Sequence, residues 1–171
     1  MIKVQEEDFS LTDEITFLKK RCNNIGALST FIGIVRDKRE DEKLVSMTLE
    51  HYPGMTESEI EKIIFDCFKK WEITGVTVIH RVGNLRPSDQ IVFVGVSSKH
   101  RQNAFNGCNF IMDWLKTKAP FWKVEENNNK KNWVSFFLKK MDVVGGFFFE
   151  KSGWGCGGGF FEKKNPRGVF F

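Results

Sequence analysis

Residues 52–81 read YPGMTESEIEKIIFDCFKKWEITGVTVIHR and combine two different periodicities. In the first 20 of these residues, apolar side chains recur at the three- and four-residue spacing of one buried helix face. Thr56 with Glu59 three positions later is typical of a capping box at a helix start. GVTVIHR (75–81) is rich in β-branched residues, which favour a strand, so the fold is expected to mix both kinds of element. The apolar helix face comprises Ile60, Ile63, Ile64, Cys67, Phe68 and Trp71.

The preceding residues predict three strands and one helix. IKVQ (2–5) reads as a short strand, and Ser10 or Thr12 can cap a helix over about residues 13–23. GALSTFIGIV (26–35) carries apolar residues on both faces, which predicts a buried strand. The charged loop RDKREDEK then leads into an alternating strand. The expected inward positions are Ile15, Phe17, Leu18 and Cys22 in the helix and Val45, Met47 and Leu49 in the last strand.

The following residues complete an α+β pattern. QIVFVGVS (90–97) predicts a strand, and a helix is expected over about residues 100–117 before Pro120 ends it. FWKVE (121–125) and NWVSF (132–136) are predicted to form a last hairpin. The predicted order is β-α-β-β-α-β-β-α-β-β, a single domain with a mostly antiparallel sheet and three helices. The helix should turn Ala104, Cys108, Ile111 and Leu115 inward.

Composition excludes several classes of protein. The net charge is +4, but residues 136–171 hold six Lys or Arg against three Asp or Glu, which leaves 20 against 19 in residues 1–135. This balance gives no support to nucleic-acid binding. The four cysteines form no C-x-x-C pair, so no metal site or redox dithiol is indicated. With no secretory leader and no membrane-length apolar run, we expect a cytoplasmic protein without a membrane partner.

The last 36 residues differ from the rest of the chain in composition and in periodicity. They contain nine of the 18 phenylalanines and eight of the 15 glycines, in runs such as FFF and GGG. No helical or strand period is present, so we expect a domain over residues 1–135 and an aberrant Phe/Gly/Lys-rich tail over residues 136–171. Two explanations stay open, a disordered extension or the product of a shifted reading frame, and the pattern favours the second.

Two clusters are candidates for anion binding. His100 and Arg101 stand where a strand ends and a helix begins, where free backbone N–H groups and an arginine can hold an anion. Arg36 follows the predicted buried strand and precedes the charged loop, a common position for ligand-binding residues. Ordinary helix capping and a solvated loop charge are the alternatives. His51 and His80 lie on predicted strands without metal-ligand spacing and are expected to be core or surface histidines.

A third cluster is DWLKTKAPFWK (113–123), in which two lysines flank a proline and two aromatic residues. A lysine in the last turn of a helix is favoured by the helix dipole, which explains Lys116 and Lys118 without any function. Lys123 lies on a predicted strand and has no such explanation. Pro120 stiffens the connection, so Lys116 and Lys123 are candidates to face one pocket as a nucleophile or base.

Five motifs, in this order, resemble the catalytic large subunit of molybdopterin synthase, the MoaE family. They are FIGIVRD (31–37), LEHYPGMTE (49–57), VTVIHRVGNL (76–85), IVFVGVSSKHR (91–101) and FIMDWLKTKAPFWKVE (110–125). The resemblance extends from about residue 2 to Val134. It implies an α/β-hammerhead-like fold and a homodimer that binds two small ubiquitin-like sulfur carriers, forming a heterotetramer. The carrier's C-terminal Gly-Gly thiocarboxylate would supply sulfur to cyclic pyranopterin monophosphate, giving the dithiolene of molybdopterin without a cofactor or metal.

The resemblance also implies site residues. Lys116 and Lys123 would be the catalytic pair, and His100, Arg101 and Arg36 would bind the pterin phosphate. The surrounding wall would comprise Ile34, Val35, Val124 and Glu125. Beyond Trp133-Val134 the chain departs from the family pattern, which normally continues with charged residues that include an arginine. The alternative is therefore a non-catalytic module that binds anions and the carrier tail and has lost activity through its altered C-terminus.

Overall fold

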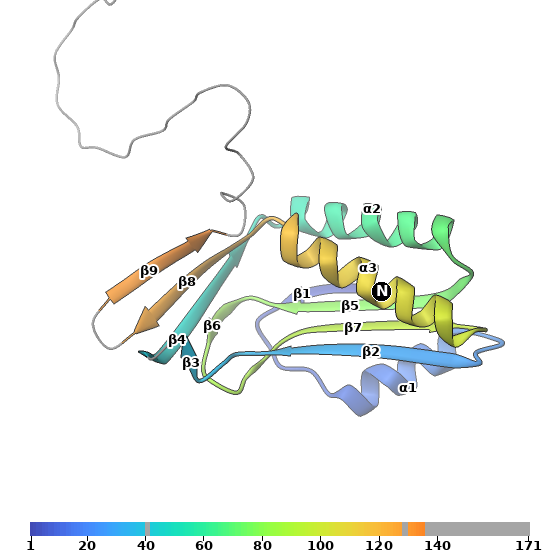
Figure 1. The fold of residues 1–171 in the computed structure, drawn as a ribbon, viewed down its shortest axis with the longest axis horizontal. Helices are drawn as coiled ribbons and strands as arrows, with labels where there is room; N and C mark the ends of the chain where they lie inside the picture. The colour runs from blue at the N-terminus through green and yellow to red at the C-terminus, as the bar shows by residue number, and fades with distance from the viewer. Residues whose placement is uncertain (40–41, 128–129, 136–171) are drawn as a thin grey trace, which may run out of the picture.

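The computed structural model describes residues 1–39, 42–127 and 130–135, and that part of the chain forms three helices and nine strands (Figure 1). The elements are β1 Ile2–Gln5, α1 Leu11–Arg21, β2 Ala27–Ile34, β3 Lys38–Arg39, β4 Glu42–His51, α2 Met55–Lys70, β5 Ile73–Arg81, β6 Gly83–Leu85, β7 Gln90–Ser98, α3 Arg101–Thr117, β8 Phe121–Asn127 and β9 Lys130–Ser135. The predicted α+β class and element order are confirmed. The structure adds two short strands, β3 in the predicted charged loop and β6 between the predicted strands at 75–81 and 90–97.

The first sheet has four strands in the order β1-β5-β7-β2. β1 runs parallel to β5, whereas the β5–β7 and β7–β2 pairs are antiparallel. Helices α2 and α3 lie on one face of this sheet and α1 lies on the other (Figure 1). The two central strands are therefore covered on both faces, which matches their almost continuous apolar sequences.

Side chains along the central strands alternate between two cores, because successive strand residues point to opposite faces. Val78 and Val94 belong to the core beneath α2 and α3, and both are fully buried. Ile79 and Phe93 point to the opposite face, where they pack with Phe9. A shift of one residue in this pairing would exchange the two cores, so the register is strongly determined.

The second sheet joins β3, β4, β8 and β9 in that order, and β6 also pairs with β4. In the β4–β8 pair, Leu49 lies opposite Lys123 and Met47 lies opposite Glu125. These four residues therefore share one face of the sheet. A small core of Val35, Leu44, Met47, Leu49 and Leu85 anchors this sheet beside the first one.

The start of α2 differs from the prediction. The capping residue is Gly54, with φ of 81°, and its N–H donates to the Glu57 carboxylate at 2.6 Å. Thr56 is already inside the helix and fully buried. Its hydroxyl accepts from the Tyr52 N–H at 3.2 Å and donates to the Pro120 carbonyl at 3.4 Å. The predicted Thr56–Glu59 capping box is therefore wrong, and Thr56 instead ties the helix start to the segment before β8.

The predicted burial of residues 26–35 is also wrong, although the strand is present. β2 lies at the edge of its sheet, next to β7, and its side chains are therefore less covered than those of the central strands. Phe31 and Ile34 are 42% and 55% exposed. Phe17 and Phe68, expected to face inward, are exposed as well. Helix α1 does begin after the predicted cap Ser10, whose hydroxyl accepts from the Asp13 N–H. Sequence periodicity located these helices and strands but did not show how much of each side chain is covered by the adjacent elements.

The sequence also predicted that no segment crosses a membrane and that residues 136–171 form a separate tail. Among the described helices, none combines the length and apolar character that a membrane crossing requires. The predicted tail, residues 136–171, lies outside the described residues.

Replacing Thr56 by valine tests the contact between α2 and the segment before β8. The change keeps the side-chain shape but leaves the Tyr52 N–H and the Pro120 carbonyl without their partner. We expect the free energy of unfolding, measured with urea, to fall by about 1–3 kcal/mol. Ser58→Ala, an exposed change on the same helix, is the control and should have little effect. Equal stability of the two variants would contradict this role for Thr56.

Candidate functional site

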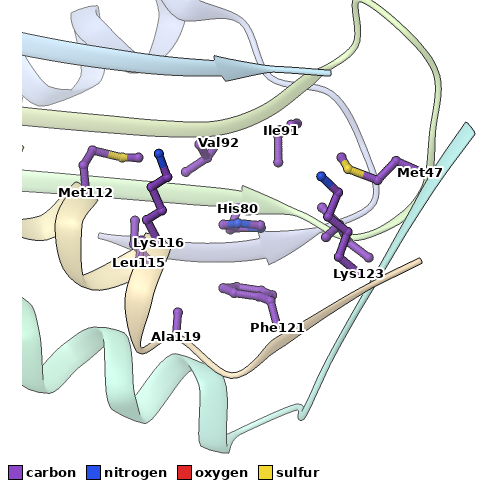
Figure 2. A pocket seen from close by; sticks show the side chains of 11 residues that line it. Met47, His80, Ile91, Val92, Met112, Leu115, Lys116, Ala119, Phe121 and Lys123 are labelled. Atoms are coloured by element: carbon purple, nitrogen blue, oxygen red, sulfur yellow. The ribbon is translucent and has the colours of Figure 1, made fainter. Parts of the chain in front are cut away.

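The two lysines that flank Pro120 line one cavity of about 170 Å³ between the two sheets (Figure 2). Lys116 enters from the last turn of α3, and Lys123 enters from β8. The remaining wall is almost entirely apolar and is formed by Met47, Leu49, His80, Ile91, Val92, Met112, Leu115, Ala119 and Phe121. Lys116 itself is exposed to solvent, whereas the side chain of Lys123 is largely buried. The apolar wall strengthens electrostatic interactions on the buried side of the cavity relative to bulk water.

A tight connection between α3 and β8 brings the lysines together. The backbone N–H groups of Lys118 and Ala119 both donate to the Trp114 carbonyl, at 2.8 and 3.3 Å, which ends the helix. The Phe121 N–H then donates to the Ala119 carbonyl at 2.9 Å, and β8 begins at once. The chain reverses within a few residues, so both amines can face one space. Lys118 is exposed and lines neither this cavity nor the one beside it.

Lys123 is held by an ion pair with Glu125, at 2.5 Å between Nζ and Oε1. The two residues are two positions apart on β8 and therefore project from the same face. Their side chains are 17% and 5% exposed, so the pair is well shielded from solvent. Truncating one partner of such a buried pair leaves the other charge uncompensated. Glu125 thus fixes the position of the Lys123 ammonium at the cavity.

A second cavity of about 130 Å³ adjoins the first, and the two share Met47, Ile91 and Lys123. Its remaining lining residues are Ile34, Val35, Arg36, Lys38, Leu44 and Glu125. Arg36 and Lys38 add two cationic side chains, which makes this compartment suited to an anionic group. Lys38 had no predicted role, because its neighbours in the sequence made it look like an ordinary loop charge.

Three predicted site residues do not reach either cavity. Val124 lies between Lys123 and Glu125 on β8, so its side chain projects to the opposite face. His100 and Arg101 lie at the N-terminal end of α3, whereas Lys116 lies in its last turn (Figure 1). At 1.5 Å per residue, Arg101 and Lys116 are separated by about 22 Å along this helix. Within one chain, the predicted phosphate-binding pair is therefore far from the lysines.

His80 is a cavity residue that sequence reasoning missed. Its ring stacks on Phe121 with centroids 3.8 Å apart and planes at 15°, and it lies between the two lysines in the view of Figure 2. Its Nδ1 lies 2.8 Å from the Arg81 carbonyl oxygen. Burial lowers the pKa of His80 to about 4, with a smaller contribution from His51, while the backbone hydrogen bond opposes the shift. His80 is therefore neutral near pH 7.

The three cysteines that the structure describes, Cys22, Cys67 and Cys108, line neither cavity of the site. Burial raises the pKa of Cys67 to about 11 and also raises the pKa of Cys108, so both thiols stay protonated. Both belong to the core beneath α2 and α3, as expected for small apolar residues. Among the described residues, no group of three or more His, Cys, Asp or Glu side chains is arranged to hold a metal ion.

Known proteins are similar to this chain in both sequence and fold. The family model described as MoaE protein matches residues 4–118. The molybdopterin synthase catalytic subunit of Ralstonia nicotianae is 50% identical over 133 residues, which cover 78% of this chain and 76% of that protein. The solved structure of the molybdopterin biosynthesis MoaE protein of Burkholderia ambifaria is 47% identical, with a TM-score of 0.69 and coverage of 78% and 88%. Molybdopterin synthase from Staphylococcus aureus is 26% identical, with a TM-score of 0.72 and coverage of 78% and 96%.

The lowered pKa of His80 predicts a pH dependence of stability. The unfolded chain takes up the imidazole proton near pH 6.5, but the folded protein does so only near pH 4. This contribution to stability is therefore complete above pH 6.5 and is lost as the pH falls through 4, a difference of roughly 3 kcal/mol.

Urea unfolding between pH 7 and pH 4 measures this dependence. Other groups titrate in this range too, so His80→Phe serves as the reference, because it keeps an aromatic ring against Phe121 and has no proton to bind. We expect the wild type to lose more stability than the variant over this interval. Parallel losses in the two proteins would show that His80 titrates normally.

Proposed function

The chain belongs to the MoaE protein family, and we propose that it is the catalytic subunit of a molybdopterin synthase. In this reaction a small ubiquitin-like carrier, charged as a C-terminal Gly-Gly thiocarboxylate, gives its sulfur to cyclic pyranopterin monophosphate. Two such transfers form the dithiolene of molybdopterin. The observation that carries the proposal is the pair of amines, Lys116 and Lys123, on one largely apolar cavity beside a second cationic compartment.

The charges in the site fit these two substrates. The phosphate and the thiocarboxylate are both anions, and cations that the fold already holds in place attract them with little reorganisation. Arg36 and Lys38, in the more polar compartment, would hold the phosphate. Ile34 and Val35 form part of the wall of that compartment. Lys123 lines both cavities and so could contact both reacting groups.

The environments of the two lysines favour different roles. Glu125 anchors Lys123 as an ammonium, which suits an electrostatic clamp on the acyl group and on the carboxylate that forms when water hydrolyses the acyl–sulfur bond. Lys116 is in no ion pair with another described residue and is exposed, so its ammonium is less constrained than that of Lys123. We assign Lys116 as the acid that protonates the leaving oxygen when the cyclic phosphate opens. The sulfur comes from the carrier, so the protonated cysteines have no role in transfer.

His100 and Arg101 require a second copy of the chain in this proposal. They cannot reach the lysines within one chain, because the length of α3 separates them. The family resemblance implies a homodimer, and a dimer in which each copy presents the start of α3 to its partner's cavity would complete the phosphate site. Each active site would then be shared between two chains.

Alanine substitution of each lysine tests the catalytic assignment. In an assay with thiocarboxylated carrier and cyclic pyranopterin monophosphate, Lys116→Ala and Lys123→Ala should each slow molybdopterin formation about 100-fold or more. Lys118→Ala, which removes the exposed lysine between them, is the matched control and should keep near-normal activity. Normal turnover by the Lys123 variant would refute the mechanism. A wild-type protein that binds the carrier but makes no product would instead support the non-catalytic module.

Mixed dimers test whether Arg101 acts across the subunit interface. Lys116→Ala and Arg101→Ala homodimers should both be impaired. A heterodimer of the two variants would contain one doubly altered site and one intact site, so activity should return on mixing and subunit exchange. If Arg101 served the cavity of its own chain, every site would lack one group and mixing would restore nothing.

A further inference from the structure

The cavity between the lysines contains only one side chain, among those described, with a strong hydrogen-bond acceptor. Lys116 and Lys123 are protonated amines that can only donate, and the rest of the wall is apolar apart from His80. A substrate made only of anionic groups would need no acceptor there. A heterocycle with ring N–H or hydroxyl groups would need one, because a buried donor without a partner is costly.

The tautomer of His80 follows from its backbone contact. The Arg81 carbonyl oxygen can only accept a hydrogen bond, so the nitrogen 2.8 Å away, Nδ1, must carry the proton. In a neutral ring, Nε2 then has a lone pair. No other described residue forms a hydrogen bond to Nε2, although the residue is only 9% exposed and lines the cavity. This unpaired acceptor is the group that His80 offers to a ligand.

The ring is also held in a fixed orientation. His80 lies on β5, which pairs with β1 through Val4 and with β7 through Val92. Phe121 stacks on the ring face, and the bond to the Arg81 carbonyl prevents a ring flip. An acceptor that is rigid before the ligand arrives costs little entropy on binding.

From this geometry we propose that His80 binds the heterocyclic substrate by accepting, through Nε2, a hydrogen bond from one of its N–H or O–H groups. The lysines and Arg36 hold the anionic parts of the two substrates, and His80 orients the neutral ring system against them. The lone pair disfavours an anion, so His80 would discriminate against the thiocarboxylate tail at this point of the cavity. This inference rests on the proposed function, because it takes cyclic pyranopterin monophosphate as the ligand.

Two substitutions separate the acceptor from the packing. His80→Phe keeps the ring stacked on Phe121 but removes Nε2, and His80→Gln can place an amide oxygen near the position of Nε2. Calorimetry should show an affinity for cyclic pyranopterin monophosphate about tenfold weaker in the Phe variant and largely restored in the Gln variant. Affinity for the carrier should be unchanged in both. His51→Phe is the matched control, because the His51 ring also lies near Phe121, with centroids 6.4 Å apart, but does not line the cavity.

Nitrogen NMR of the wild-type protein provides a second measurement that does not depend on any variant folding. The Nε2 resonance of His80 should be that of an unprotonated nitrogen and should shift when cyclic pyranopterin monophosphate is added, while Nδ1 stays protonated. An unshifted Nε2 at saturating ligand, unchanged affinity in His80→Phe, or no binding of the precursor to the wild type would overturn the inference. Wild-type synthesis of molybdopterin together with normal precursor binding by His80→Phe would overturn this inference alone. His80-dependent binding without sulfur transfer would overturn the proposed function alone.

Discussion

The short connection between α3 and β8 fixes the geometry on which the site depends. Its hydrogen bonds to Trp114 end the helix, and the Thr56 hydroxyl holds the Pro120 carbonyl from the start of α2. This connection joins the helical layer of the first sheet to a strand of the second. Because both ends are anchored in packed layers, the separation of Lys116 and Lys123 is set by the fold and not by two flexible side chains alone.

The site balances its charges over two compartments with different surroundings. One is apolar, with donors at its rim and a neutral imidazole in its wall, and the other contains most of the cationic groups. Glu125, itself buried, offsets part of this positive charge and keeps Lys123 in place between the compartments. A cluster of cations without such an acid would be held apart by mutual repulsion. The acid is therefore part of what makes a dense cationic site stable before substrates arrive.

The sequence predicted what depends on local pattern and missed what depends on neighbours. Helical spacing in residues 60–71 and alternation in the central strands located the elements, and the stiff segment around Pro120 correctly indicated that the two lysines could face one space. The exposure of Phe31 could not be predicted, since it follows from the position of β2 at a sheet edge. His80 was passed over because its role depends on Phe121, which is distant in the sequence. The length of the predicted helix over residues 100–117 already implied that Arg101 and Lys116 lie far apart. The prediction nevertheless assigned both residues to one site.

The parallel pairing of β1 with β5 has a consequence for how the chain folds. The pairing of these strands joins residues about 76 positions apart, with Ile2 opposite Val78 as one example. Closing so long a loop costs more entropy than forming the antiparallel β5–β7 pair, whose strands are close in the sequence. We therefore expect β5 and β7 to associate first and β1 to join an existing sheet edge. The strand that carries His80 would then be held by β7 alone until β1 joins its other side.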